Sequence, residues 1–93
     1  MSVQAAIEKK LQDIFKPDRL DVINESHLHA GHAGGFDGAG ETHFRVRIMS
    51  QSFAGKSRIE RHRAVNETLK AELASGVHAL AVEPAAPGEP VRW

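Results

Sequence analysis

Three histidines stand close together in the first half of the chain and carry its clearest potential for chemistry. His27, His29 and His32 are separated by two and three residues. Histidine is the commonest protein metal ligand, and its charge changes near neutral pH. A glycine-rich run follows, so few apolar neighbours are at hand to bury the three imidazoles. A ligand site and a solvated, glycine-rich flap both fit this pattern.

The three other histidines fall in different settings. His78 opens a predicted strand directly after a helix stop at Gly76, where side chains from a loop and a sheet edge converge, so it is a candidate for function. His43 is predicted to lie on the open face of a strand. His62 lies on the apolar stripe of a predicted helix, which favours a half-buried, hydrogen-bonded structural residue. Without cysteine or carboxylate at fixed offsets, a histidine cluster is only a weak metal signal.

Composition narrows the class of protein. The 93 residues are enough for one small domain, and 12 acidic residues balance 12 basic ones. Zero net charge disfavours a protein devoted to non-specific binding of nucleic acid or acidic membranes. The chain has no cysteine, so any iron–sulfur chemistry needs thiolates from another molecule. It lacks a bilayer-spanning apolar run and a signal-peptide core. We expect a soluble, cytoplasmic protein without membrane association.

Catalytic signatures are missing from the sequence. There is no nucleophile elbow around a serine, no Walker loop and no dinucleotide fingerprint. We therefore expect no enzymatic activity. The chemistry that remains is that of ligand binding by histidine and of contacts made by charged surfaces.

Hydrophobic periodicity and capping signals predict the elements that position these residues. Ser2 can cap a first helix that Pro17 stops, and Ser57 with Glu60 forms a capping box at the start of another. A local break in that later helix is expected near residues 60–62, and its apolar stripe includes Ile59. The predicted elements are a helix over 2–16, strands over 20–24 and 42–50, a helix over 57–75 and a strand over 77–82.

The strand over 42–50 has the clearest pattern. Phe44, Val46 and Ile48 alternate with polar residues that include Arg45 and Arg47. One face of this strand should therefore be buried, and the other should be open and basic.

Together these elements predict a single-domain α+β fold of the order α-β-β-α-α-β. The first two strands can pair as a long-looped hairpin, and a strand–helix–strand crossover should make the last strand parallel. The result is a three-stranded mixed sheet with helices on one face. We expect the domain to span residues 1–83 and a loosely held, proline-rich tail to span 84–93.

Four stretches closely resemble the BolA family: NESHLHAGHAG, GETHFRVRIMSQSFAG, RIERHRAVNETLKAEL and GVHALAV. The resemblance covers residues 5 to 83, and its most specific pieces are ETHFRV, the RHR at 61–63 and VHAL. It implies a fold similar to class II KH domains, in agreement with the predicted element order.

The resemblance also implies a partner and a cofactor. BolA-like proteins pair with monothiol glutaredoxins and share a bridging [2Fe–2S] cluster in iron–sulfur trafficking and iron homeostasis. The glutaredoxin side supplies a cysteine and glutathione. On this side the resemblance assigns His78 and the loop residue His29, with His32 and His27 as alternatives. No cluster is expected in the isolated chain, and an apo homodimer remains open.

A second role implied by the family is that of a DNA-binding transcriptional regulator of the stress and morphology type. Zero net charge and the lack of a GxxG between helices count against strong DNA binding. The predicted partner- or nucleic-acid-facing residues are Arg45, Arg47, Arg58, Arg61 and Arg63.

Overall fold

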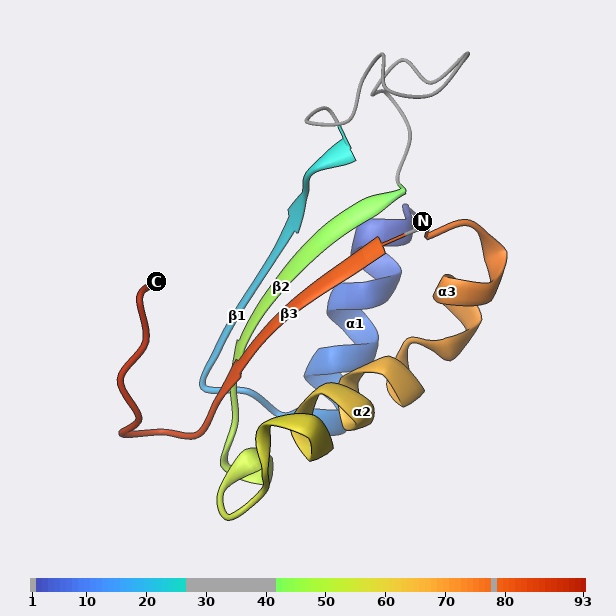
Figure 1. Cartoon of the computed structure of the whole chain (residues 1–93). Coiled ribbons are helices and arrows are strands. Elements are labelled where there is room, and N and C mark those ends of the chain that lie inside the picture. The colour runs from blue at the N-terminus through green and yellow to red at the C-terminus, as the bar shows by residue number, and fades with distance from the viewer. Residues whose placement is uncertain (1, 27–41, 78) are drawn as a thin grey trace.

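The computed structural model of the chain describes residues 2–26, 42–77 and 79–93. Its elements follow the predicted order, with the 3₁₀ turn η2 added between the second strand and the second helix (Figure 1). In the described part of the chain, every helix is too short or too polar to cross a bilayer. The bounds are α1 Val3–Phe15, β1 Arg19–Asn24, β2 His43–Met49, η2 Gln51–Phe53, α2 Arg58–Thr68, α3 Lys70–Ser75 and β3 Ala79–Ala85.

Helix α1 forms as its capping signals predict. The Ser2 hydroxyl accepts a hydrogen bond from the Ala5 N–H at 3.0 Å, which satisfies one of the donors that a helix start leaves unpaired. Lys16 ends the helix in the left-handed region, with φ at 44°. Ile7 and Leu11 are fully buried, whereas Ile14 is 61% exposed. The buried face of α1 therefore includes Ile7 and Leu11 but not Ile14.

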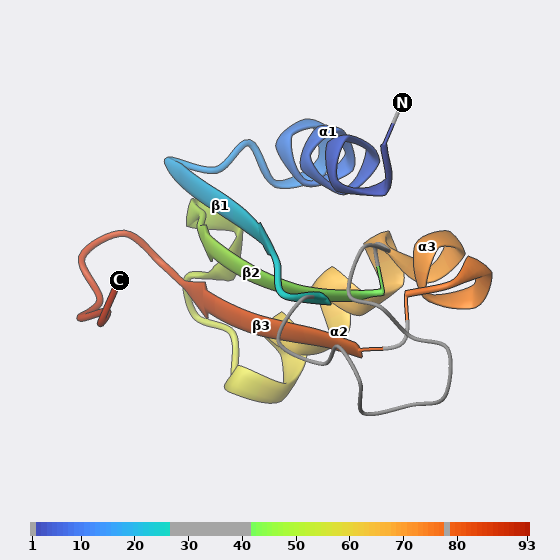
Figure 2. The same ribbon diagram turned by 90° about the horizontal axis from the view of Figure 1, so that it is seen from above.

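The sheet has the order β1-β2-β3, with β2 in the centre. β2 pairs antiparallel with β1 and parallel with β3, as predicted. Phe44, Val46 and Ile48 are buried on one face of β2, which confirms the alternation. The three helices all lie on one side of the sheet in Figure 1. Figure 2 shows α1 and α3 on one side of the strands and the C-terminal segment on the other. The predicted mixed sheet with helices on one face is confirmed.

The second helical segment starts as predicted and breaks elsewhere. The Ser57 N–H donates to the Glu60 carboxylate at 2.8 Å, and the Glu60 N–H donates back to the Ser57 hydroxyl at 3.1 Å. This capping box holds the first turn, so the predicted break near residues 60–62 is wrong. The break falls at Leu69, whose backbone angles are −101° and 19°. Ile59 was expected on the buried stripe but is 69% exposed. Val65 and Leu69 carry the core contact instead.

Strand β3 lies later in the chain than predicted. It runs over Ala79–Ala85 rather than 77–82, and it includes Pro84. Proline is tolerated there because β3 is an edge strand, whose outward N–H groups need no partner in the sheet.

The segment after β3 is attached to the rest of the domain at two points. Arg61 on α2 pairs through both terminal nitrogens with the Glu89 carboxylate. Arg19 donates to the Trp93 carbonyl at 3.0 Å, and its guanidinium lies 4.9 Å from the centre of the Trp93 ring. The C-terminal segment therefore has defined contacts with both α2 and the start of β1.

Candidate functional site

The four histidines predicted as ligands, His27, His29, His32 and His78, lie outside the described residues. The residues on either side of them are described. The candidate site is therefore built from its frame, which consists of Ser26 and Thr42 around the segment 27–41, and Ala79 after position 78.

Ser26 ties the two ends of the segment 27–41 together. Its side chain is fully buried, and its hydroxyl accepts hydrogen bonds from the Thr42 N–H at 3.0 Å and the His43 N–H at 3.2 Å. The Ser26 N–H donates to the Asn24 side-chain oxygen at 2.9 Å. The Glu25 N–H adds a bond to the His43 carbonyl at 2.8 Å. One buried hydroxyl thus fixes both ends of the segment to the sheet.

The third strand joins the same end of the sheet. The Ala79 N–H donates to the Thr42 carbonyl at 3.2 Å, and Ala79 is the register partner of His43 in the parallel pair. Ser26, Thr42 and Ala79 form one hydrogen-bonded group, which we call the loop junction. The described neighbours of both predicted ligand segments therefore converge at this junction.

His43 lies at the loop junction itself. Its side chain is half-buried rather than freely exposed, and its Nδ1 lies 2.8 Å from the Thr42 hydroxyl. Within residues 2–26, 42–77 and 79–93, no three histidine or acidic side chains are grouped so as to hold a metal ion.

The outer face of the sheet is open, as predicted, but its arginines are matched by carboxylates. The Arg45 Nε lies 2.9 Å from the Glu25 carboxylate, and the Arg47 Nε lies 3.0 Å from that of Glu83. Arg45 also approaches Glu83 at 3.5 Å. The hydrogen bond to Glu25 raises the pKa of Arg45, and the one from Arg47 lowers the pKa of Glu83. Two strand arginines and two glutamates therefore neutralise one another on this face.

Arg61 holds the C-terminal segment. Besides its pairing with Glu89, its Nε donates to the Lys56 carbonyl at 3.0 Å. The hydrogen bond from Arg61, helped by the Ala86 N–H, lowers the pKa of Glu89 to about 2. The Arg61 guanidinium is thus already hydrogen-bonded within the domain.

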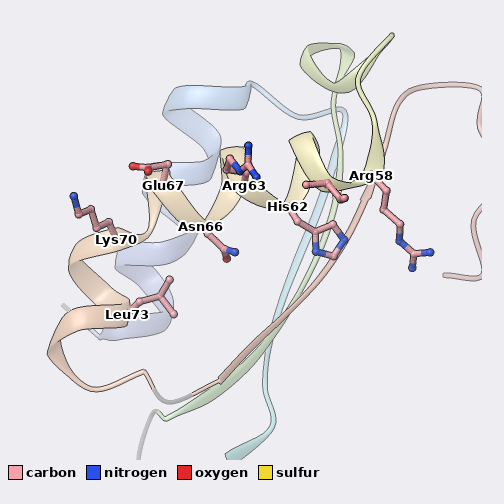
Figure 3. A pocket seen from close by; sticks show the side chains of 8 residues that line it. Arg58, His62, Arg63, Asn66, Glu67, Lys70 and Leu73 are labelled. Carbon is pink, nitrogen blue, oxygen red and sulfur yellow. The ribbon is translucent and has the colours of Figure 1, made fainter.

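Arg58 and Arg63 are exposed on α2 and lie along a groove with a volume of about 600 Å³ (Figure 3). His62 is half-buried in the same groove, as predicted, but its buried Nε2 has no hydrogen-bond partner within residues 2–26, 42–77 and 79–93, where the predicted bond was expected. The described residues that line the groove are Arg58, Ile59, His62, Arg63, Asn66, Glu67, Lys70 and Leu73.

Sequence reasoning did not identify the residues that frame the site. Ser26 precedes the histidines and reads as an ordinary loop residue. Glu83 could have been found from the strand register, since it is the partner of Arg47 in the β2–β3 pair. Glu89 lies in a proline-rich stretch that gives no local signal for an ion pair.

Comparisons with known proteins agree with this architecture. A family model described as BolA-like protein matches residues 11–89. The chain is 67% identical over 93 residues to an "uncharacterized protein in cobS 5'region" of a Sinorhizobium species, with 100% of both chains covered. It is 49% identical over 80 residues to the DNA-binding transcriptional regulator BolA of Vibrio cholerae, which covers 86% of this chain and 71% of that one.

The solved structure of the BolA domain of SufE1 from Arabidopsis thaliana has the same fold. It matches with a TM-score of 0.86 and 41% identity, covering 97% of this chain and 98% of that one. The family match spans most of the sequence, and the order of helices and strands agrees with it. The chain therefore belongs to the BolA-like protein family.

Proposed function

We propose that this chain is a non-enzymatic cytoplasmic protein that pairs with a monothiol glutaredoxin and shares a bridging [2Fe–2S] cluster with it. Its role is then in iron–sulfur cluster trafficking and iron homeostasis. The proposal starts from membership of the BolA-like family and from the resemblance of the histidine segments to those of that family.

The loop junction is the observation that best supports the proposal. Ser26 and Thr42 flank the segment with three histidines, and Ala79 follows His78. These three residues are linked by hydrogen bonds of 3.0 and 3.2 Å. A site that takes one ligand from each segment needs both segments anchored at the same end of the sheet, and the described residues provide that anchor.

The donor chemistry fits half of a shared cluster. The chain has no cysteine, so it cannot supply the four thiolates of a conventional cluster. His29 and His78 would hold one iron, with His32 or His27 as alternatives to His29, and the thiolates would come from the glutaredoxin and glutathione. Neutral imidazole makes a cluster less negative and raises its reduction potential. Because the imidazole must be deprotonated to bind, assembly should weaken in acid.

The experiment is a titration of this chain into cluster-loaded monothiol glutaredoxin, followed by visible absorption and circular dichroism. Wild type should change the spectrum, His78→Ala should lose the change, and His29→Ala should weaken it. His62→Gln, which removes an imidazole from α2 instead, should behave as wild type. An unchanged spectrum and unchanged cluster lability in both ligand variants would contradict the proposal. His32→Ala and His27→Ala, run in the same way, decide which loop histidine binds.

Direct DNA binding is a second candidate function. The Vibrio cholerae relative is named as a DNA-binding transcriptional regulator, which supports it, and Arg58, Arg63 and Lys70 are exposed along the groove of α2 and α3. Three phosphate contacts predict a log–log salt dependence with a slope of about −2.7. Cluster-bridged pairing should respond instead to glutathione and oxygen, so the two functions separate in one pair of titrations.

A further inference from the structure

The groove along α2 and α3 has the size and shape of a binding surface. Its volume of about 600 Å³ lies within the range of ligand sites, and all of its described lining residues come from the two consecutive helices. Helix α2, over residues 58–68, is about 16 Å long, which is roughly three turns, and the groove continues past the break at Leu69 to Leu73 on α3. A docked helix of similar length would follow α2.

The groove carries an apolar side chain on each of its two helices. Ile59 on α2 and Leu73 on α3 both line it, one on either side of the break at Leu69. Ile59 is 69% exposed, and among the described residues only Ile14 is a comparably exposed large apolar side chain. A partner seated in the groove would cover Ile59.

The charges in the groove favour an acidic partner. Arg58, Arg63 and Lys70 carry three positive charges, against one negative charge on Glu67. Figure 3 shows Arg58 extending away from the start of α2, with Arg63 further along the same helix. No aromatic side chain is among the described lining residues, so bases of a nucleic acid would have no ring there on which to stack. An acidic, partly apolar polypeptide fits these features better than a nucleic acid does.

The side chain of His62 gives independent evidence that the groove binds a partner. It lines the groove between the two apolar ends, and its Nε2 is buried without a hydrogen-bond partner among the described residues. Buried polar atoms normally have partners, and an unpaired one costs free energy. A rotation of the ring that brings Nε2 to a polar group of a docked segment would remove that cost.

We propose that the α2–α3 groove docks an acidic amphipathic helix of a partner protein. Apolar residues of that helix would contact Ile59 and Leu73, and its carboxylates would pair with Arg58, Arg63 and Lys70. This surface does not use the proposed cluster ligands, so the inference goes beyond the proposed function and stands or falls separately.

The test uses the full chain labelled with nitrogen-15 and a synthetic helical peptide of about 18 residues, long enough to span the groove. The peptide carries leucines at heptad spacing and glutamates beside them. Its binding is followed by amide chemical shifts and by fluorescence anisotropy. Saturable binding with shifts centred on α2 and α3 is expected, together with loss of binding when the glutamates are replaced by lysines.

Two matched pairs of variants localise the binding. Ile59→Ser should weaken peptide binding about tenfold, the effect of leaving one apolar side chain uncovered. Ile14→Ser, at a similarly exposed isoleucine on α1, should leave the affinity within about twofold. Arg63→Glu should weaken binding more than about tenfold and flatten its salt dependence, because it turns an attraction into a repulsion. Lys9→Glu makes the same charge change on α1 and should have little effect.

The inference is overturned if the peptide shows no saturable binding at millimolar concentration. Equal losses in Ile59→Ser and Ile14→Ser would also overturn it, because the binding would then not depend on the groove. So would a single-stranded DNA oligonucleotide that shifts α2 and α3 under conditions in which the acidic peptide does not.

Discussion

Replacing Ser26 by alanine should both destabilise the domain and weaken the mixed cluster. The hydroxyl accepts hydrogen bonds from two backbone N–H groups, those of Thr42 and His43, and the residue is fully buried. Each buried donor left unpaired costs about 1–3 kcal/mol. Since both donors are only partly buried and water can replace part of the loss, we expect a total of about 2–3 kcal/mol. For a domain of this size that corresponds to a fall in Tm of about 10 °C or more.

Ser50→Ala supplies the matched control at the opposite end of β2. Ser50 is 1% exposed, its hydroxyl donates to the Phe15 carbonyl at 2.7 Å, and it accepts from the Ser52 N–H at 3.1 Å. Its loss should cost a similar free energy of unfolding. Urea denaturation followed by far-ultraviolet circular dichroism measures both variants. Cluster formation with glutaredoxin is then measured well below the midpoint of either transition, where both chains are folded.

The two serine variants should differ in function although they match in stability. Ser26→Ala should weaken cluster formation, because it frees both ends of the histidine segment, whereas Ser50→Ala should not. Equal cluster formation in the two variants would refute the claim that the loop junction positions the ligands. A cost below about 0.5 kcal/mol for Ser26→Ala would refute the hydrogen-bond argument on which the magnitude rests.

Three further outcomes test the rest of the structure. Phe53→Ala should lower the free energy of unfolding in urea by about 3–5 kcal/mol, because the ring is fully buried and its centre lies 5.1 Å from that of the Phe15 ring. A loss under about 1 kcal/mol would contradict this packing. The pKa of Glu89 is lowered from 4.5 to about 2, so its contact with α2 is fully present above pH 4.5 and is lost as the pH falls through about 2. Fluorescence of Trp93, the only tryptophan, should report that release, and Glu89→Gln should abolish the acid transition; a transition that survives the substitution would have another origin. Glu83→Gln should strengthen DNA binding at low salt and steepen its salt dependence, because Arg45 and Arg47 lose a shared carboxylate. Fluorescence anisotropy measures both effects, and an unchanged salt dependence would show that this face does not contact DNA.

Local signals in the sequence predicted most of the fold. The alternation of Phe44, Val46 and Ile48 with polar residues identified the central strand, because that strand is buried on one face only. The serine caps at residues 2 and 57 marked both helix starts, since they depend on residues only three positions away. Interactions over such short distances can be read from sequence.

Features that depend on tertiary packing could not be predicted in this way. The helix break at Leu69 has no glycine or proline to signal it, and Leu69 is in fact buried there. Ile59 fits the apolar period of the helix but extends beyond the part of α2 that meets the core. Strand β3 runs through Pro84 because it lies at a sheet edge, and edge or centre is a property of the assembled sheet.

The candidate site, too, could be predicted from the sequence only in part. Histidine spacing and family resemblance predict His29 and His78 as ligands, which stays a prediction because both lie outside the described residues. Without the strand register, the sequence carries no sign that the basic strand face is neutralised. Arg45 meets Glu25 from across the β1–β2 pair and Glu83 from β3, and both contacts join residues distant in the chain. Counting arginines therefore overstates the positive charge that this face can offer to DNA.

Nitrogen hyperfine spectroscopy of the reduced mixed complex tests the central claim most directly. Only this chain would carry nitrogen-15 histidine, and the glutaredoxin and glutathione would be unlabelled. The account predicts strong nitrogen-15 couplings from imidazoles bound to the cluster iron, with one coupling lost in His78→Ala and another in His29→Ala. A cluster spectrum without any strong nitrogen-15 coupling would mean that all ligands come from the glutaredoxin side, and it would contradict the account.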